Sequence, residues 1–254
     1  MLSHDLIITT YNSYRYLNSL YSFVSQNIKK YSKIIIVDDY SDLDFYNLLN
    51  SKLNEFKNII LFRNKSNFGP SASRNNGIKI SNAEYISFHD PDDFVCKERY
   101  DIINYYLTNF KPEVLFHDFT TTKLKKNIIN THKYKYHYGF IYLFKSLYVT
   151  PAFTCRRILL EKVGSYNEDI RYGEDLDLYI KLKNQSKFLF VNQELVKISS
   201  KSERIKNVDH LSSNLKLMRK SINKILISRI FPINLKSIFY ALALVINILK
   251  KFID

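Results

Sequence analysis

The chain of 254 residues carries 38 Lys and Arg against 24 Asp and Glu, a formal net charge of +14, and is 46% hydrophobic and 15% aromatic. This composition excludes a disordered chain, and two cysteines without metal-ligand spacing, Cys96 and Cys155, exclude a disulfide scaffold. The length suits one α/β domain with an appendage, and the positive charge predicts an anionic partner such as a nucleotide, anionic lipid or nucleic acid. His4 and Asp5 stand where a signal peptide would be apolar, so we expect a cytosolic protein.

The first eighty residues alternate strand-like and helix-like segments. Apolar, β-branched runs at residues 6–10, 34–37 and 59–62 predict strands, and apolar residues at helical spacing in 17–28 and 45–53 predict amphipathic helices. Such alternation predicts an α/β fold with a mostly parallel central sheet flanked by helices. Ligands of such sheets bind beyond the carboxyl ends of the strands.

A further strand-like run, residues 85–88, ends in His89, Asp90, Pro91, Asp92 and Asp93. Buried carboxylates without a partner are strongly unfavourable, so these acids predict an open edge of the sheet that faces solvent or a cation. A hard ion that also binds a diphosphate, Mg²⁺ or Mn²⁺, is the functional interpretation. An Asp-rich turn without a ligand is the alternative.

The ends of these strands are expected to share one crevice that contains Thr9, Asp39 and Asp92. No Gly-rich dinucleotide turn or P-loop follows any strand, so carboxylates and a metal would hold a nucleotide there. The segment "NFGPSASRNNGIKI" predicts a turn at Gly69 and Pro70 and a helix with Ser71 as its N-cap.

Arg74 would project from the early turns of this helix. It is interpreted as a partner for phosphate or for the Asp cluster, or else as a solvated helix cation. Farther on, "EVLFHDF" is consistent with a strand, and residues 121–140 are basic, aromatic and turn-rich, which favours a mobile lid over the site. No RNA-binding signature accompanies this segment, so we expect no nucleic-acid partner, and its histidines lack zinc-like spacing.

Apolar residues at helical spacing from Leu176 to Leu182 predict a helix that opens with Glu174 and Asp175. Acids in a first turn often do no more than complement the helix dipole. The alternative is a catalytic role beside the acid cluster that follows the strand at 85–88.

Five motifs in order resemble the GT-A fold glycosyltransferases of family 2, across roughly residues 6–196. They are "IITTYN", "IIIVDDYSD", "NFGPSASRNNGI", "YISFHDPDDF" as the DxD-type metal motif, and "GSYNEDIRYGEDLDLYIKL" as the acceptor-side ED motif. Tyr40 departs from the pattern, because glycine usually follows the two aspartates of the second motif.

The resemblance implies a Rossmann-like GT-A fold and roles for individual residues. It implies nucleotide contacts from Thr9, Tyr11, Asp39 and Arg74, a ribose or sugar contact from Asp92, a metal ligand at Asp93, and a catalytic base at Asp175 with Glu174 beside it. Arg156 and Arg157 would lie near the site.

The implied activity is that of a metal-dependent, inverting, hexosyltransferase-like enzyme that uses Mn²⁺ or Mg²⁺. It would transfer a sugar from a nucleotide-sugar, with UDP favoured, to a saccharide or lipid-linked acceptor during surface glycan synthesis. The alternatives are a nucleotidyltransferase that acts on a sugar phosphate and a non-catalytic basic module that binds nucleic acid or lipid.

The chain changes character near residue 209, so we divide it into a catalytic domain at 1–208 and a helical extension at 209–254. Apolar residues from Leu211 to Ile225 form a stripe against basic residues, and residues 233–253 contain a second apolar segment too short for a confident transmembrane helix. These helices are interpreted as a peripheral anchor on an anionic membrane surface at its cytoplasmic face. Otherwise they pack on the catalytic domain or in a homo-oligomer.

Overall fold

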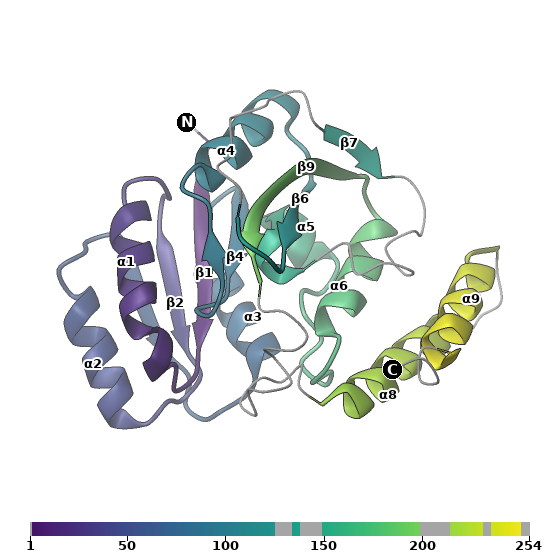
Figure 1. The fold of residues 1–254 in the computed structure, drawn as a ribbon, viewed down its shortest axis with the longest axis horizontal. Coiled ribbons are helices and arrows are strands. Elements are labelled where there is room, and N and C mark those ends of the chain that lie inside the picture. The colour runs from purple at the N-terminus through teal and green to yellow at the C-terminus, as the bar shows by residue number, and fades with distance from the viewer. Residues whose placement is uncertain (1, 125–133, 138–148, 199–213, 231–234, 250–254) are drawn as a thin grey trace.

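The computed structural model describes residues 2–124, 134–137, 149–198, 214–230 and 235–249 (Figure 1). Within these residues one sheet runs in the order β3-β2-β1-β4-β8-β6-β9-β5, with β7 paired to β9. The strands are β1 (His4–Thr10), β2 (Ile34–Asp38), β3 (Ile59–Arg63), β4 (Tyr85–His89), β5 (Phe94–Val95), β6 (Val114–Thr120), β7 (Tyr134–His137), β8 (Phe153–Arg156) and β9 (Phe188–Lys197).

Strands β1 to β4 are parallel neighbours, as are β6 and β9, whereas β8 runs antiparallel to both β4 and β6. The expected α/β fold with a mostly parallel sheet is confirmed. The carboxyl ends of β1, β2 and β4 therefore meet at one edge, and the reversed β8 brings its beginning to that edge.

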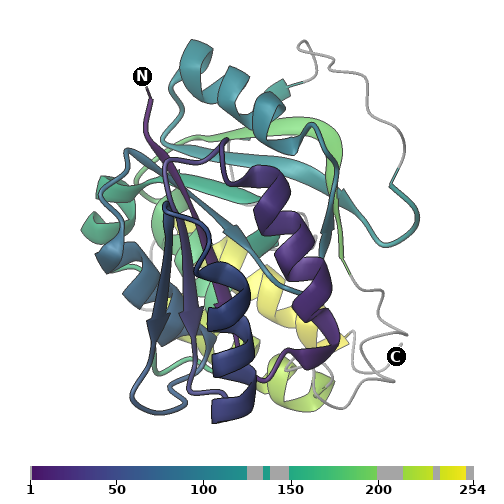
Figure 2. The ribbon, with the colours of Figure 1, turned by 90° about the vertical axis from the view of Figure 1, so that its left-hand side faces the viewer.

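Helices cover both faces of the sheet (Figure 2). They are α1 (Leu17–Asn27), α2 (Leu43–Leu53), α3 (Pro70–Ile80), α4 (Arg99–Phe110), α5 (Arg157–Lys162), α6 (Glu174–Lys183), α8 (Leu215–Ile230) and α9 (Leu235–Leu249), with short 3-10 turns at Tyr14–Tyr16 and Thr150–Ala152. Alternate residues of each strand point to opposite faces, so Leu6 and Ile8 pack with α1 and α2, and Ile7 packs with α3 and α6.

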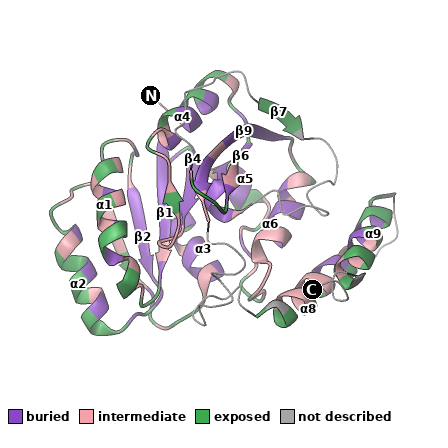
Figure 3. Cartoon of the chain, in the orientation of Figure 1, coloured by how far each residue is buried: buried purple, intermediate pink, exposed green. Residues whose placement is uncertain are grey.

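The C-terminal helices α8 and α9 pack in the same apolar cluster as α6. Ile225 and Leu226 of α8 and Tyr240 and Ala243 of α9 are buried in this cluster. Figure 3 shows that α9 nevertheless exposes much of its outer surface. No helix in the described ranges is long and apolar enough to cross a bilayer. The boundary expected between residues 208 and 209 lies outside the described residues, as do residues 125–133 and 138–140 of the expected lid.

The structure corrects two local expectations. Gly69, at φ 88°, is the N-cap of α3, because Pro70 occupies the first turn and Ser71 lies inside the helix. Arg156 and Arg157 lie at the opposite end of the sheet from the crevice, where Arg156 pairs with Glu84. The physical reason is the reversed direction of β8, which carries its last residues toward the beginning of β4.

Candidate active site

A cavity of about 710 Å³ lies beyond the carboxyl ends of the parallel strands. Its volume is in the range typical of small-molecule sites. The residues that line it include every residue to which a nucleotide, metal or catalytic role is assigned above: Thr9, Tyr11, Asp39, Arg74, Asp92, Asp93, Glu174 and Asp175. The expected crevice shared by Thr9, Asp39 and Asp92 is therefore confirmed.

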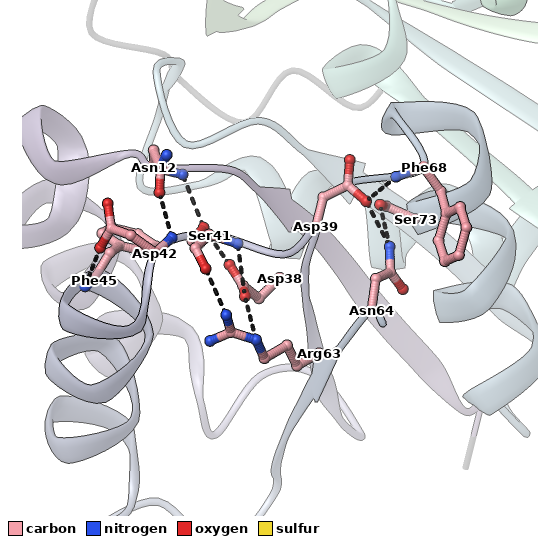
Figure 4. Close-up of polar contacts among 10 residues, drawn as sticks. All are labelled: Asn12, Asp38, Asp39, Ser41, Asp42, Phe45, Arg63, Asn64, Phe68 and Ser73. Carbon is pink, nitrogen blue, oxygen red and sulfur yellow. Dashed lines mark hydrogen bonds and ion pairs between the residues drawn. The ribbon is translucent and has the colours of Figure 1, made fainter. Parts of the chain in front are cut away.

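Asp39, directly after β2, is fixed by hydrogen bonds from the turn that leads into α3 (Figure 4). Its Oδ1 accepts from Asn64 Nδ2 at 2.7 Å and from the Phe68 backbone N–H at 3.0 Å, and its Oδ2 accepts from the Gly69 N–H at 2.8 Å. Asn64 also donates to Ser73 Oγ at 2.9 Å. Each carboxylate oxygen can accept two bonds, so Oδ2 keeps capacity for a donor from a ligand.

The neighbouring Asp38 is not among the residues that line the cavity, and its side chain has a structural role. It is fully buried, accepts from the backbone N–H and hydroxyl of Ser41, and lies 3.7 Å from Arg63 Nε. Tyr40 between them adopts φ 66°, a left-handed conformation that explains why glycine is usual at this position. The Arg63 guanidinium lies 5.3 Å from the centre of the Tyr40 ring, a cation–π contact that offsets part of that strain.

Asn12 links the loop after β1 to the loop after β2. Its backbone N–H donates to Ser41 Oγ at 2.8 Å, and its side-chain oxygen accepts from the Asp42 N–H at 2.9 Å (Figure 4). Asp42 in turn caps α2 through the Phe45 N–H. Tyr11, next to Asn12, is half exposed on the rim of the cavity, and its position follows from these loop contacts.

The start of β8 is held against the end of β4 by a buried arginine. Arg99 donates to the carbonyl oxygens of Phe88 at 3.2 Å and of Pro151 at 2.7 Å, and to His117 Nε2 at 3.1 Å. Burial, together with the Arg99 charge, lowers the pKa of His117 to about 3 and keeps the ring neutral. Pro151 lines the cavity, so Arg99 supports one wall of it from behind.

Arg74 lines the cavity and lies between two acidic segments, one after β4 and one at the start of α6. Its guanidinium lies 3.3 Å from Asp90 Oδ1 and 3.0 Å from Glu174 Oε1, and its side chain is 8% exposed. Burial alone would lower the pKa of Arg74, but the charges of Asp90 and Glu174, together with Tyr166, raise it, so the group stays charged. Arg74 is thus a partner of the acid cluster and not a solvated helix cation.

Helix α6 begins at the cavity with Glu174 and Asp175, as the sequence predicts. Gly173 caps it at φ 76°, a conformation that favours glycine. Burial and the adjacent Glu174 charge raise the pKa of Asp175 to about 7, whereas Glu174 is paired with Arg74. A carboxylate with this pKa is suited to accept a proton near neutral pH.

Sequence reasoning did not assign three residues that build the site. Asp90 shares Arg74 with Glu174, Asn64 orients Asp39, and Asn75 ties α3 to the turn before α6 by donating to Glu168 and to the Tyr166 carbonyl. A signal existed for Asn64, which directly follows a strand whose neighbours also end in site residues. Asn75 carried no such signal, because its partners lie about ninety residues farther along the chain.

A divalent cation fits the chemistry of this edge. Asp90, Asp92 and Asp93 present hard oxygen donors to the cavity. No group of three His, Cys, Asp or Glu side chains in the described parts of the chain could hold a metal by itself. One or two carboxylates that share Mg²⁺ or Mn²⁺ with substrate phosphates are a common arrangement, and it needs no such group.

Comparison with known proteins gives concordant matches. The model of the family described as glycosyl transferase family 2 matches residues 5–163. An uncharacterised glycosyltransferase of Methanocaldococcus jannaschii is 28% identical over 220 residues, 84% of this chain and 74% of that protein. A poly(ribitol-phosphate) beta-glucosyltransferase of Bacillus spizizenii is 36% identical over 124 residues, 48% of this chain but 19% of that enzyme.

A solved structure shares the fold. The crystal structure of S. aureus TarS 1–349 in complex with UDP-GlcNAc superposes with a TM-score of 0.72 at 17% identity, covering 96% of this chain and 70% of that one. At that identity the likeness concerns the arrangement of the elements alone.

Proposed function

Because the chain belongs to glycosyl transferase family 2, we propose that it transfers a sugar from a UDP-sugar to a hydroxyl group of a saccharide or lipid-linked acceptor, with inversion at the anomeric carbon. The observation that carries this proposal is Asp175. It lies on the cavity wall with a pKa of about 7, beside a glutamate that forms an ion pair with Arg74.

In this mechanism Asp175 takes the proton of the acceptor hydroxyl while that oxygen attacks the anomeric carbon. The bond from the anomeric carbon to the diphosphate oxygen breaks, and its electron pair leaves with UDP. Attack opposite the leaving group inverts the configuration. Glu174 is the weaker candidate for the base, because its Oε1 already accepts from Arg74 at 3.0 Å.

The donor would lie along the edge formed by β1, β2 and β4. Thr9, Tyr11 and Asp39 line the part of the cavity assigned to the nucleotide, and Asp92 the part assigned to ribose or sugar. Asp93 would hold Mn²⁺ or Mg²⁺ together with the diphosphate. Such an ion stabilises the negative charge that develops on the leaving group. Arg74 brings a fixed positive charge to the same edge.

We place the reaction in the synthesis of a surface glycan. The support is a relative whose name specifies poly(ribitol-phosphate), although the 124 matched residues cover 19% of that enzyme. The family assignment excludes the alternative of a non-catalytic basic module. A nucleotidyltransferase would instead leave the nucleotide on its product.

We further propose that the C-terminal helices bind an anionic membrane at its cytoplasmic face. Asn247 of helix α9 faces inward and donates to Asn223 of α8 at 2.7 Å. Its outer face exposes Ile238, Phe239, Leu242, Val245 and Ile246. A helix that is apolar toward solvent is typical of an interfacial element, and the net charge of +14 complements anionic lipid.

The activity is tested by incubating the protein with UDP-, GDP- and CMP-sugars and measuring free nucleotide, with and without Mn²⁺. Thermal shift with the nucleotides alone provides a binding readout, since a ligand of the folded state raises its stability. We expect metal-dependent stabilisation by UDP and release of UDP in the presence of acceptor. Release of pyrophosphate from UTP and a sugar 1-phosphate, with no release of UDP from any UDP-sugar, would support the nucleotidyltransferase instead.

A further inference from the structure

The start of α6, which carries Glu174 and Asp175, is clamped from behind by α8. Three contacts made by α8 fall within five residues of one another on α6 and the turn before it. They precede and follow the two acids that line the cavity. Helix α8 lies in the last fifth of the chain, outside the residues matched by the family model.

The first contact fixes the turn before the acids. Ser221 Oγ of α8 donates to the Tyr172 carbonyl at 2.7 Å. This carbonyl lies just ahead of the helix N-cap, so the bond sets how far the first turn of α6 extends toward the cavity.

The second contact is steric and involves Gly173. A Cβ atom at this position would lie 3.3 Å from Ile222 Cγ1 and 3.6 Å from Ile225 Cδ1. The α8 side chains therefore pack directly against the backbone of the residue before Glu174. A displacement of α8 toward or away from α6 would therefore move the backbone of Gly173.

The third contact sets the rotation of α6 about its own axis. Asp177, buried on the side away from the cavity, pairs with Arg229 of α8. Successive helical residues are separated by about 100°, so Asp177 projects about 160° away from Asp175. A rotation of α6 that broke the Arg229 pair would carry Asp175 away from the acceptor by a similar angle.

We propose that α8 is part of the catalytic apparatus and that Ser221 and Arg229 are positioning residues that hold Asp175 in its productive orientation. This inference rests on the function proposed above for Asp175. Misplacement of a reacting group by about 1 Å can lower a rate by on the order of a hundredfold, so a clamp at this point matters more for turnover than for donor binding. The donor-side residues Thr9, Tyr11 and Asp39 lie in or directly after β1 and β2, at a different part of the cavity lining.

The test compares Ser221→Ala, Arg229→Met and Arg229→Lys with two matched controls. Ser228→Ala removes an exposed hydroxyl from the same helix, and Lys162→Met removes an exposed cation from α5. For each variant one measures kcat with a soluble acceptor, the Kd of UDP by calorimetry, and hydrogen exchange in peptides that cover residues 171–178.

We expect Arg229→Met and Ser221→Ala to lower kcat at least tenfold with the Kd of UDP within twofold of wild type. Arg229→Lys should recover much of the loss, and both controls should behave as wild type. Exchange at residues 171–178 should be at least tenfold faster in Arg229→Met than in Lys162→Met. This readout tests the clamp even in the absence of turnover.

Unchanged exchange at residues 171–178 in both Ser221→Ala and Arg229→Met would overturn the clamp. Wild-type kcat in these variants, while Asp175→Asn is inactive, would overturn the positioning role. If kcat and UDP affinity fall together in these variants, α8 supports the fold in general and does not specifically position Asp175. If instead wild-type protein releases no nucleotide with any donor while the exchange result holds, the proposed function fails and the clamp stands.

Discussion

Arg74 donates to Glu174 across the cavity floor at 3.0 Å, and this contact makes two adjacent carboxylates chemically different. The Glu174 charge is offset by the guanidinium. Asp175 is partly buried beside that glutamate and has a pKa of about 7. Sequence alone left the choice of base open by one residue, and the ion pair favours Asp175.

Replacing Asp175 with Asn keeps the volume of the side chain and removes its ability to accept a proton. We expect turnover to fall by about 10² to 10⁴-fold, the usual range for a positioned base, with UDP affinity near wild type. Steady-state kinetics and calorimetry measure the two quantities. Glu174→Gln is the comparison and should cost less; full turnover in Asp175→Asn with none in Glu174→Gln would move the base to Glu174.

The pH dependence of kcat provides an independent test of the same assignment. Because the base must be deprotonated, kcat should rise with pH along a limb of apparent pKa about 7. The Glu174 charge raises the pKa of Asp175 and the Arg74 charge lowers it. Glu174→Gln should therefore shift the limb to lower pH, and Arg74→Met to higher pH. If Glu174→Gln and Arg74→Met shift the pH limb of kcat in the same direction, the opposite effects assigned to these two charges are wrong.

The free energy of unfolding should depend on pH because of the carboxyl group of Asp175. Its pKa is raised in the folded state, so between about pH 4 and 7 the native protein holds a proton that the unfolded chain releases, and the free energy of unfolding falls as pH rises. Asparagine does not titrate. Relative to wild type, Asp175→Asn should gain on the order of 4 kcal/mol from pH 4 to pH 8 in urea unfolding. A pH-independent difference would show that Asp175 has an ordinary pKa.

Asp93→Ala should abolish metal-dependent nucleotide binding while leaving the fold intact, because the residue lines the open cavity. Thermal shift with UDP, with and without Mn²⁺, measures both effects. Asp101→Ala, which removes a surface acid that pairs with Lys30, serves as the control and should respond to Mn²⁺ as wild type does. Wild-type Mn²⁺ dependence in Asp93→Ala would remove this residue from the metal site.

Membrane binding should depend on the outer face of α9. The double change Leu242→Ser and Ile246→Ser should weaken sedimentation with anionic vesicles, and raising salt should weaken binding of the unchanged protein. Ile158→Ser is the matched control, since Ile158 is an exposed apolar residue of α5. Wild-type sedimentation of the double variant would exclude this face. Loss of a dimer in sedimentation velocity, without a change in vesicle binding, would assign the face to a second copy.

The alternation of apolar runs was enough to predict the strands that build the donor edge. Thr9, Asp39 and Asp92 could be placed together because the ends of parallel strands must meet. Arg156 could not be placed, because strand direction in β8 depends on its antiparallel pairing with β4 and not on local composition. The link between Arg229 and Asp177 joins segments 52 residues apart, and no local pattern reports such a contact.

The three hydrogen bonds that Asp39 accepts from its own chain have a consequence for how a donor would be captured. A carboxylate already immobilised by folding loses little conformational entropy when a nucleotide arrives, so the strand edge is preorganised for its ligand. Substitution of Asn64 would therefore act on donor affinity at a distance. It would leave every contact with the nucleotide in place and make their formation less favourable.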